Sequence, residues 1–430
     1  MIRTVFPAES LGGEVRVPAD KSLTHRSYLF AALADGPSRV YGPLTGEDCV
    51  STRRCLSALG TEFVDHADGS VGVIPSADWV SPEAPLDCGN SGTTMRLLSG
   101  ILAGKGIAAT LDGDASLSRR PMSRIATPLR EMGAEVAGDR PPIRVNARGL
   151  RGIEYASPIA SAQVKSCVLL AGLYASGTTS VTEPSRSRDH TERMLAAMGA
   201  EIEVHGLTAT VRSGATLRGF EFHVPGDISS AAFWLVAGAL AAGSGIRLPG
   251  VNVNPTRTGI LDVLAQVGAE VTVSPEPDRL GEPVATLQVR RHARRAFEIR
   301  GALVPRLIDE IPVLAVLATQ CEGETLIRDA SELRVKESDR IAVVADGLAR
   351  MGATIDARPD GFRIIGPTPL SGTTVDAAGD HRIGMAFSIA GLFARGETTI
   401  MNADSIATSY PSFFDDLTRL GGASLDGRSA

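Results

Sequence analysis

The chain has 430 residues, of which 43% are hydrophobic and 21% charged, a composition typical of a globular protein with two or three domains. A net charge of −6 argues against a general nucleic-acid binder, and the longest nearly unbroken apolar run, residues 233–243, is too short to cross a bilayer. Five scattered cysteines with no CxxC pair, and a start without an apolar leader, predict a cytoplasmic protein with reduced thiols.

The predicted elements recur six times, about every 70 residues. In each copy a polar turn leads into a small, strongly apolar helix. These helices are expected to begin near Lys21, Asn90, Ser161, Asp227, Asp309 and His381. A second, amphipathic helix ends with Leu-x-x-(Leu/Met/Val)-Gly, where the glycine can adopt positive φ. These glycines are Gly60, Gly133, Gly199, Gly268, Gly352 and Gly421.

A strand signal follows most of these helices, so the copies predict an α/β fold of six helix–strand–helix–strand units. The first helix of each unit is apolar nearly all round and is expected to be buried, whereas the second is expected outside. Three units for each lobe give two domains. Because no linker rich in Pro, Ser or charge separates the lobes, short hinges should join them.

The starts of the apolar helices carry an unusual number of cations. Lys21, Arg26, Arg96 and Arg382 lie in the first turns, where the helix dipole is already positive. Such an arrangement is favourable when an anion binds there. For Asp227 and the serines after it, helix N-capping is the simpler interpretation.

Further candidates lie elsewhere in the repeat. Lys336 and Arg340 have the i, i+4 spacing of one helical face, with Glu337 beside them. Arg120 and Arg188 lie in loops before amphipathic helices. The histidines show no metal-binding spacing, and no GxGxxG, GxxxxGK(S/T) or GxSxG motif occurs, so we expect neither a metal nor a cofactor.

Taken together, these segments resemble the 5-enolpyruvylshikimate-3-phosphate synthase family of enolpyruvyl transferases over essentially the whole chain. The motifs that carry the resemblance are Asp20-Lys21-Ser22 with Arg26, Gly89-Asn90-Ser91-Gly92-Thr93, Arg120-Pro121-Met122, Ser161-Ala162-Gln163, Leu307-Ile308-Asp309-Glu310, Arg334-Val335-Lys336-Glu337-Ser338-Asp339-Arg340 and Asp380-His381-Arg382. Any one of them is weak evidence, but seven in order and in register with the repeat are specific.

The resemblance implies an inside-out α/β barrel of two similar domains, each with three βαβαββ repeats, and an active site in the interdomain cleft. Residues 20–227 would form the N-terminal domain, on the shikimate 3-phosphate side. Residues 1–19 and 228–430 would form the C-terminal domain.

The implied reaction transfers the enolpyruvyl group of phosphoenolpyruvate to the 5-hydroxyl of shikimate 3-phosphate and releases phosphate. This addition–elimination passes through a tetrahedral intermediate and lies on the route to chorismate and aromatic amino acids. Together the two substrates carry roughly five to six negative charges, which the cationic side chains would offset.

By the same resemblance, each candidate residue takes a role. Shikimate 3-phosphate would contact Lys21, Ser22, Arg26, Ser161, Ala162, Gln163, Arg188, Asp309 and Lys336. Phosphoenolpyruvate would contact Lys21, Asn90, Gly92, Arg120, Gln163, Arg340 and Arg382. Among the catalytic candidates, Asp309 is the general base and Glu337 the acid that protonates the methylene carbon. Lys336 lies at the 5-hydroxyl, with Lys21 and His381 in support.

Two features bear on the inhibitor glyphosate. Ala162 and Thr408 stand where many members have serine and lysine, a pattern of the less sensitive bacterial branch. Gly92 stands where tolerant members usually have alanine, which indicates sensitivity. The two features therefore point in opposite directions.

Two alternatives remain. The UDP-N-acetylglucosamine enolpyruvyl transferases share the architecture but typically carry a mobile-loop cysteine, and residues 105–122 contain none. A non-catalytic anion-binding module would be expected to lack Asp309, Lys336 or Glu337. The expected partners are small molecules only, without nucleic acid or membrane, and the expected state is a monomer.

Overall fold

The computed structural model describes residues 1–146, 148–290 and 294–427. The chain divides into two compact units. The N-terminal unit comprises Ala19–Val224 together with the short segment Asp278–Glu282. The C-terminal unit comprises Met1–Pro18, Pro225–Pro277 and Pro283–Ala430.

The described residues form six four-stranded sheets, three in each unit, and all six share one topology. The first two strands of each sheet are parallel, and the second and third are antiparallel.

In the N-terminal unit the sheets run β14(Glu221–His223)-β3(Ser38–Tyr41)-β5(Val71–Ile74)-β4(Glu62–Asp65), β6(Leu86–Asp87)-β7(Ala109–Asp112)-β9(Ile143–Asn146)-β8(Glu135–Ala137) and β10(Glu154–Ala156)-β11(Thr178–Thr182)-β13(Thr208–Arg212)-β12(Ile202–His205). In the C-terminal unit they run β2(Gly12–Glu14)-β15(Gly245–Asn252)-β17(Glu282–Arg290)-β16(Glu270–Arg279), β18(Glu298–Ile299)-β19(Gly323–Ile327)-β21(Gly361–Gly366)-β20(Thr354–Arg358) and β22(Thr374–Asp376)-β23(Thr398–Met401)-β1(Ile2–Phe6)-β24(Ala423–Gly427).

Each repeat contributes one buried helix and one amphipathic helix. The buried helices are α1(Lys21–Ala31), α3(Gly92–Lys105), α5(Ala162–Gly172), α7(Ile228–Leu240), α9(Ile311–Thr319) and α11(His381–Leu392). The amphipathic helices are α2(Glu47–Ala58), α4(Ser123–Glu131), α6(His190–Ala197), α8(Gly259–Val267), α10(Arg340–Arg350) and α12(Phe413–Arg419). Every residue of α7, α9 and α11 is buried, which agrees with their uninterrupted apolar sequence. The α/β class and the two-unit organisation with three βαβαββ repeats in each unit are thus confirmed.

The ends of the helices follow from single residues. All six repeat glycines have positive φ, between 82° and 106°, a conformation that costs glycine little. Aspartate or serine caps five of the six buried helices by accepting a backbone N–H bond: Asp20, Ser91, Ser161, Asp227 and Asp380.

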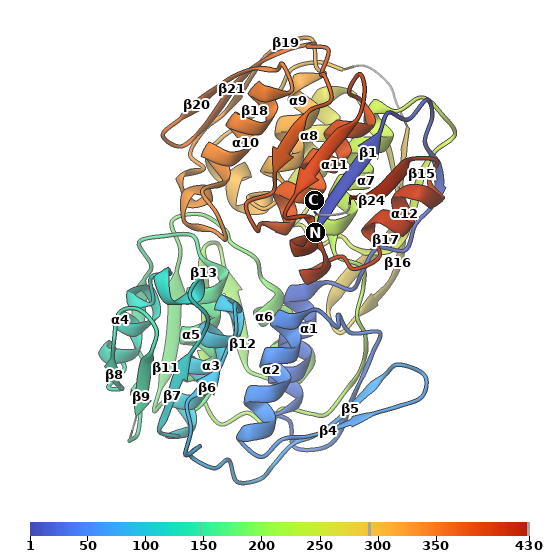
Figure 1. Cartoon of the computed structure of the whole chain (residues 1–430). Helices are drawn as coiled ribbons and strands as arrows, with labels where there is room; N and C mark the ends of the chain where they lie inside the picture. Colours follow the sequence, from blue (N-terminus) through green and yellow to red (C-terminus); the bar gives the residue numbers. More distant parts are fainter. Residues whose placement is uncertain (147, 291–293, 428–430) are drawn as a thin grey trace. The chain divides into compact units, whose positions relative to one another are not determined.

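The chain exchanges strands between repeats that are distant in sequence. β2 precedes α1 but pairs with β15, and β14 precedes α7 but pairs with β3. The N-terminal strand β1 lies between β23 and β24, so the first and last strands of the protein are neighbours, as the blue strand beside the red ones in Figure 1 shows. The sixth repeat is therefore assembled from both ends of the chain.

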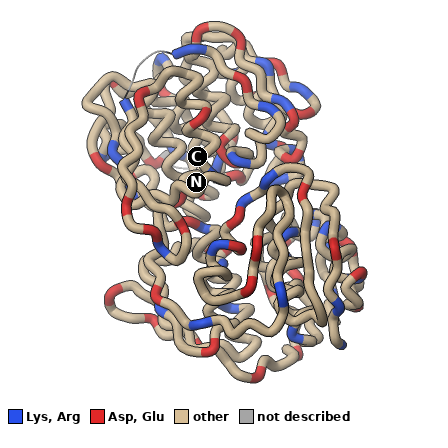
Figure 2. The backbone as a smooth tube through the Cα atoms, turned by 180° about the vertical axis from the view of Figure 1, so that it is seen from behind, with Lys and Arg blue, Asp and Glu red and all other residues tan. Residues whose placement is uncertain are grey.

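Surface charge and cysteine chemistry agree with the expectations from composition. Basic and acidic residues are interspersed along both units (Figure 2). All five cysteines are free and buried. Among the described residues, none of the helices is both long enough and apolar enough to span a bilayer.

Candidate functional site

In the N-terminal unit, side-chain hydrogen bonds link the starts of the three buried helices. The residues concerned, here called the N-terminal cluster, are Lys21, Ser22, Arg26, Asn90, Gly92, Arg96, Arg120, Ser161, Ala162, Gln163 and Arg188. Between α3 and α5, Arg96 donates to Gln163 Oε1, and Gln163 Nε2 donates to Thr93 Oγ1 over 2.9 Å. Between α1 and α5, Arg26 donates to Ser166 Oγ over 2.9 Å. Three helix N-termini therefore meet in one place.

Arg26 is held rigidly in this cluster. Its guanidinium is only 3% exposed and also donates from Nε to Thr191 Oγ1 over 2.8 Å. Burial, with a smaller contribution from the nearby charge of Arg188, lowers the pKa of Arg26 to about 10, so Arg26 is still a cation at neutral pH. Arg188 itself is half-buried in the loop before α6. These two arginines form one cationic region suited to an anion.

Lys21 is the first residue of α1, and its Nζ lies 3.0 Å from Asp48 Oδ2 at the start of α2. Beneath it, the buried His25 Nδ1 is 2.6 Å from Thr52 Oγ1. Burial lowers the pKa of His25 to about 3, so this imidazole is neutral and acts only as a hydrogen-bonding partner of Thr52. Of Lys21 and His25, only Lys21 therefore carries a positive charge at neutral pH.

Around Gly92 the backbone leaves room for guanidinium groups. A Cβ on Gly92 would lie 2.8 Å from one terminal nitrogen of Arg96 and 3.6 Å from one of Arg120. Arg120 donates to both the side-chain oxygen and the carbonyl oxygen of Asn90. The absence of a side chain at Gly92 therefore lets two arginines approach the start of α3.

The C-terminal unit holds a second cluster, here called the C-terminal cluster: Asp309, Lys336, Glu337, Arg340, His381 and Arg382. At its centre, Arg340 is 1% exposed and donates to three carboxylates. The distances are 2.8 Å to Asp380, 3.2 Å to Asp309 and 2.7 Å to Glu337. Burial lowers the pKa of Arg340, but the three carboxylates outweigh it, so the pKa lies above the ordinary value and the cation is permanent.

Two further positively charged side chains lie close to the Asp309 carboxylate. Lys336 Nζ lies 3.5 Å from one of its oxygens, and a terminal nitrogen of Arg382 lies 3.8 Å from the other. Asp309 therefore lies within 4 Å of three positively charged side chains. Asp309 precedes α9, Arg382 lies in α11 and Arg340 begins α10, so here too the helix starts converge. His381 is buried as the first residue of α11.

The sequence prediction was wrong about the helix that carries Lys336. Lys336 and Arg340 do not share a helical face, because α10 begins at Arg340. Lys336 follows the short 3₁₀ helix Ser331–Val335 and has extended backbone. Asp339 stops the helix from extending backwards, since its side chain caps α10 by accepting from the Ala342 N–H. Both cations nevertheless contact Asp309.

Several residues support the C-terminal cluster without belonging to a predicted motif. Asp227 caps α7 as expected, since it accepts from the Ser229 N–H, but it also pairs with the buried Arg257 over 3.0 Å. Arg257 donates to Ser229 as well, and Ser229 donates to Glu310, the neighbour of Asp309. Arg257 belongs to none of the motifs found in the sequence, so this network is recognised only from the contacts of Arg257 in the structure.

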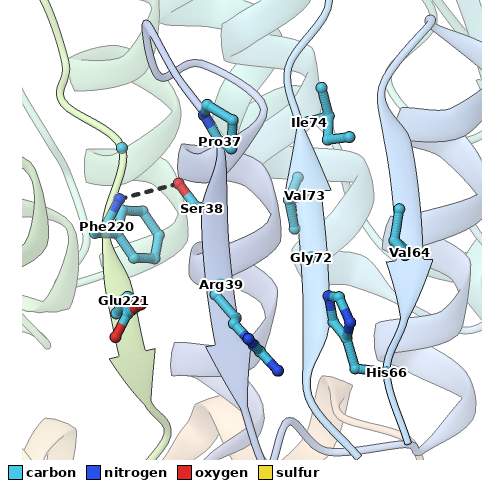
Figure 3. A pocket seen from close by; sticks show the side chains of 11 residues that line it. Pro37, Ser38, Arg39, Val64, His66, Gly72, Val73, Ile74, Phe220 and Glu221 are labelled. Carbon is cyan, nitrogen blue, oxygen red and sulfur yellow. Dashed lines mark hydrogen bonds between the residues drawn. The ribbon is translucent and has the colours of Figure 1, made fainter.

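A cavity of about 500 Å³ lies elsewhere, on the sheet formed by β14, β3, β5 and β4 (Figure 3). Arg39, His66, Gly72, Phe220 and Glu221 are among its lining residues, and none of the N-terminal cluster residues lines it. In the part of the chain that the structure describes, no group of three or more His, Cys, Asp or Glu side chains could hold a metal ion. Each cluster is therefore the candidate site of its own unit, and the chemistry of both is that of cations, carboxylates and helix N-termini.

Comparison with known proteins agrees with this chemistry. The model of the EPSP synthase (3-phosphoshikimate 1-carboxyvinyltransferase) family matches residues 5–417. A 3-phosphoshikimate 1-carboxyvinyltransferase of Gloeobacter violaceus is 52% identical over 424 residues, covering 97% of this chain and 98% of the relative. One of Geobacillus kaustophilus is 50% identical over 420 residues, covering 96% and 98%.

Solved structures give the same result. The structure of EPSP synthase from Acinetobacter baumannii superposes with a TM-score of 0.89 at 42% identity, and the match covers 99% of this chain and all of that one. The coverage is nearly complete in both directions for the sequence relatives and for this structure. The chain therefore belongs to the EPSP synthase (3-phosphoshikimate 1-carboxyvinyltransferase) family.

Proposed function

We propose that this protein transfers the enolpyruvyl group of phosphoenolpyruvate to the 5-hydroxyl of shikimate 3-phosphate, with release of phosphate. The observation that carries the proposal is that three helix N-termini and several cations meet in each unit, one group centred on Arg26 and the other on Arg340. Each substrate bears a phosphate and a carboxylate. Preorganised positive charge is what such substrates need in order to be bound side by side.

For the acceptor, the N-terminal cluster supplies the main contacts. Ser22 and Arg26 hold the carboxylate of shikimate 3-phosphate, and Arg188 with Ser161, Ala162 and Gln163 holds its phosphate and ring. Lys21, Asn90, Gly92 and Arg120 serve phosphoenolpyruvate, with Gln163 shared. Support comes from the buried hydrogen bonds of Arg26, which fix its orientation before any substrate arrives.

For the chemistry, the C-terminal cluster supplies the proton-transfer groups. Asp309 removes the proton of the 5-hydroxyl while Lys336 holds that oxygen. Glu337 protonates the methylene carbon, and Arg340 and Arg382 hold phosphoenolpyruvate, with His381 in support. The hydroxyl oxygen adds to the enol carbon. The tetrahedral intermediate then loses phosphate and one methyl proton, which returns to Glu337, and the C=C bond forms again. The contacts of Asp309 with Lys336, Arg340 and Arg382 support this role because they fix the position of its carboxylate.

The direct test is phosphate release from phosphoenolpyruvate, with shikimate 3-phosphate or UDP-N-acetylglucosamine as acceptor. We expect release only with shikimate 3-phosphate. Release with UDP-N-acetylglucosamine alone would assign the protein to the related transferases. Binding of shikimate 3-phosphate without any release would indicate a non-catalytic module.

Lys21→Met is expected to weaken the binding of both substrates by about tenfold or more, since a cation contributes on the order of 1.4 kcal/mol or more to each. Isothermal titration with each substrate measures this. Lys105→Met is the matched control, because Lys105 lies at the last turn of α3 over the rings of Trp79 and Tyr174. Titrations of Lys21→Met that match the wild type would remove Lys21 from the site.

Gly92→Ala is expected to raise the KM for phosphoenolpyruvate by roughly tenfold. The new methyl displaces the Arg96 guanidinium, which is the end of a flexible side chain, so the melting temperature should barely change. Gly36→Ala is the control, since a Cβ there meets nothing within 4 Å. An unchanged KM would show that Gly92 is not close to the substrate.

Two further proposals concern setting and inhibition. The five free, buried thiols fit a reducing compartment, so we place the protein in the cytoplasm.

We also propose that glyphosate competes for the cations that bind phosphoenolpyruvate. Gly92→Ala should then raise the inhibition constant of glyphosate along with the KM.

A further inference from the structure

Lys165 lies on α5 among the deepest charged groups of the N-terminal unit. It is 4% exposed, and its Nζ lies 2.9 Å from Glu183 Oε2 and 2.7 Å from Glu192 Oε1. Both glutamates are also buried, at 3% and 4% exposure. The other oxygen of each carboxylate has no hydrogen-bond partner among the described residues, so Lys165 is the main compensation for both charges.

The two glutamates lie at either end of the segment that carries Arg188. Glu183 Oε2 accepts from the Ser187 hydroxyl over 2.8 Å and from its backbone N–H over 3.4 Å. Ser187 directly precedes Arg188. Glu192 lies in the first turn of α6. Lys165 thus ties both ends of residues 183–192 to one point on α5.

The same segment also orients Arg26. Thr191, next to Glu192, accepts from Arg26 Nε and is 2.7 Å from Ser166 Oγ, the neighbour of Lys165. Ser166 in turn accepts from Arg26. Two adjacent residues of α5 and two adjacent residues of α6 therefore form one layer beneath the Arg26 guanidinium.

The two glutamates keep Lys165 positively charged. Burial lowers the pKa of Lys165, but Glu192 and Glu183 raise it by more, so the pKa lies above its ordinary value and Lys165 stays protonated. Buried charges of this kind are costly when one partner is removed and are often neutral for stability when all are replaced together.

We infer that Lys165, Glu183 and Glu192 form a positioning triad that sets Arg188 and Arg26 at the spacing needed for the anionic groups of the acceptor substrate. The inference rests on the proposed function. The triad does not touch the substrate: it acts by fixing both ends of the Arg188 segment and the Thr191 partner of Arg26.

The decisive variant replaces all three charges with side chains of similar size, Lys165→Met with Glu183→Gln and Glu192→Gln. Lys165→Met alone leaves two buried carboxylates without their cation, so a failure of that variant to fold is not informative. For the triple variant we expect a Kd for shikimate 3-phosphate raised by about tenfold or more, with the KM for phosphoenolpyruvate at saturating acceptor within about twofold of the wild type. A purely structural role would not separate the two substrates in this way.

Lys165→Arg is the conservative variant. A cavity of about 260 Å³ is lined by Lys165, Glu183 and Glu192 and leaves room for the larger guanidinium. Arginine can donate to both carboxylates, so the acceptor Kd should stay within about threefold of the wild type. Lys105→Met serves again as the control for loss of a lysine in the same unit.

The outcomes separate the two proposals. A folded triple variant that binds shikimate 3-phosphate like the wild type, or one that loses both substrates equally, overturns the triad and leaves the proposed function intact. A wild type that binds the acceptor but releases no phosphate refutes the proposed function, while the titrations still decide the triad. A wild type that does not bind shikimate 3-phosphate overturns both.

Discussion

Asp309→Asn is expected to lower kcat by roughly 10²- to 10⁴-fold, the usual contribution of general acid–base catalysis, with the Kd for shikimate 3-phosphate changed by no more than about threefold. The amide keeps the size of the carboxylate but cannot accept a proton. Because Arg340, Lys336 and Arg382 stay in place, the anionic groups of the substrates keep their partners. Phosphate release measures kcat, and calorimetry measures the Kd.

Asp346→Asn is the matched control for this effect. Asp346 lies on α10, exposed and paired with Arg350 one turn away. Its replacement should leave both kcat and the Kd unchanged. If Asp309→Asn turned over at the wild-type rate, Asp309 would have no part in proton transfer, and Glu337 or Lys336 would have to supply the base.

Arg340→Met is expected to destabilise the protein by about 3–5 kcal/mol, the usual cost of removing one partner from a buried ionic group. The variant leaves Asp309, Glu337 and Asp380 close together without the cation that each of them contacts. Catalysis should be lost as well, since the orientation of Asp309 depends on Arg340. Urea unfolding followed by circular dichroism measures the change in stability.

Arg350→Met is the control on the same helix. Arg350 is 60% exposed and pairs with Asp346, so its loss should cost no more than about 0.5 kcal/mol. An unfolding free energy for Arg340→Met equal to that of the control would mean that the three carboxylates do not depend on Arg340.

The repeat architecture was predictable because one residue type marks each boundary. A glycine with positive φ must follow each amphipathic helix, so Gly60 and its five counterparts reveal the period directly. The buried helices are equally clear, since helices such as α7 consist almost entirely of apolar residues. Both features depend on residues that are neighbours in the chain, so the sequence alone is enough to predict them.

The contacts within the clusters and the triad were less predictable, because they join residues far apart in the chain. Lys165 and Glu192 are separated by 27 positions, and no spacing rule links them. One indirect signal existed: only four of the 43 basic residues are lysines. Three of these, Lys21, Lys165 and Lys336, pair with carboxylates at or next to the candidate site, where a compact point charge differs most from arginine.

The prediction for Lys336 and Arg340 failed for a related reason. Their i, i+4 spacing is necessary for a shared helical face but not sufficient. Asp339 can cap a helix as easily as it can lie inside one, and the observed cap at Ala342 starts α10 at Arg340. A capping residue within a charged string makes such spacing ambiguous.

The position of β1 between β23 and β24 has a consequence for biosynthesis. Translation releases Ile2–Phe6 first, yet both hydrogen-bonding neighbours of this strand are made last. The ribosome must therefore deliver nearly the whole polypeptide before the final sheet can close, while the unit built around Ala19–Val224 has all its parts once Glu282 has emerged. Folding of the nascent chain should accordingly proceed in two stages, because β1 cannot complete its sheet before β23 and β24 have been made.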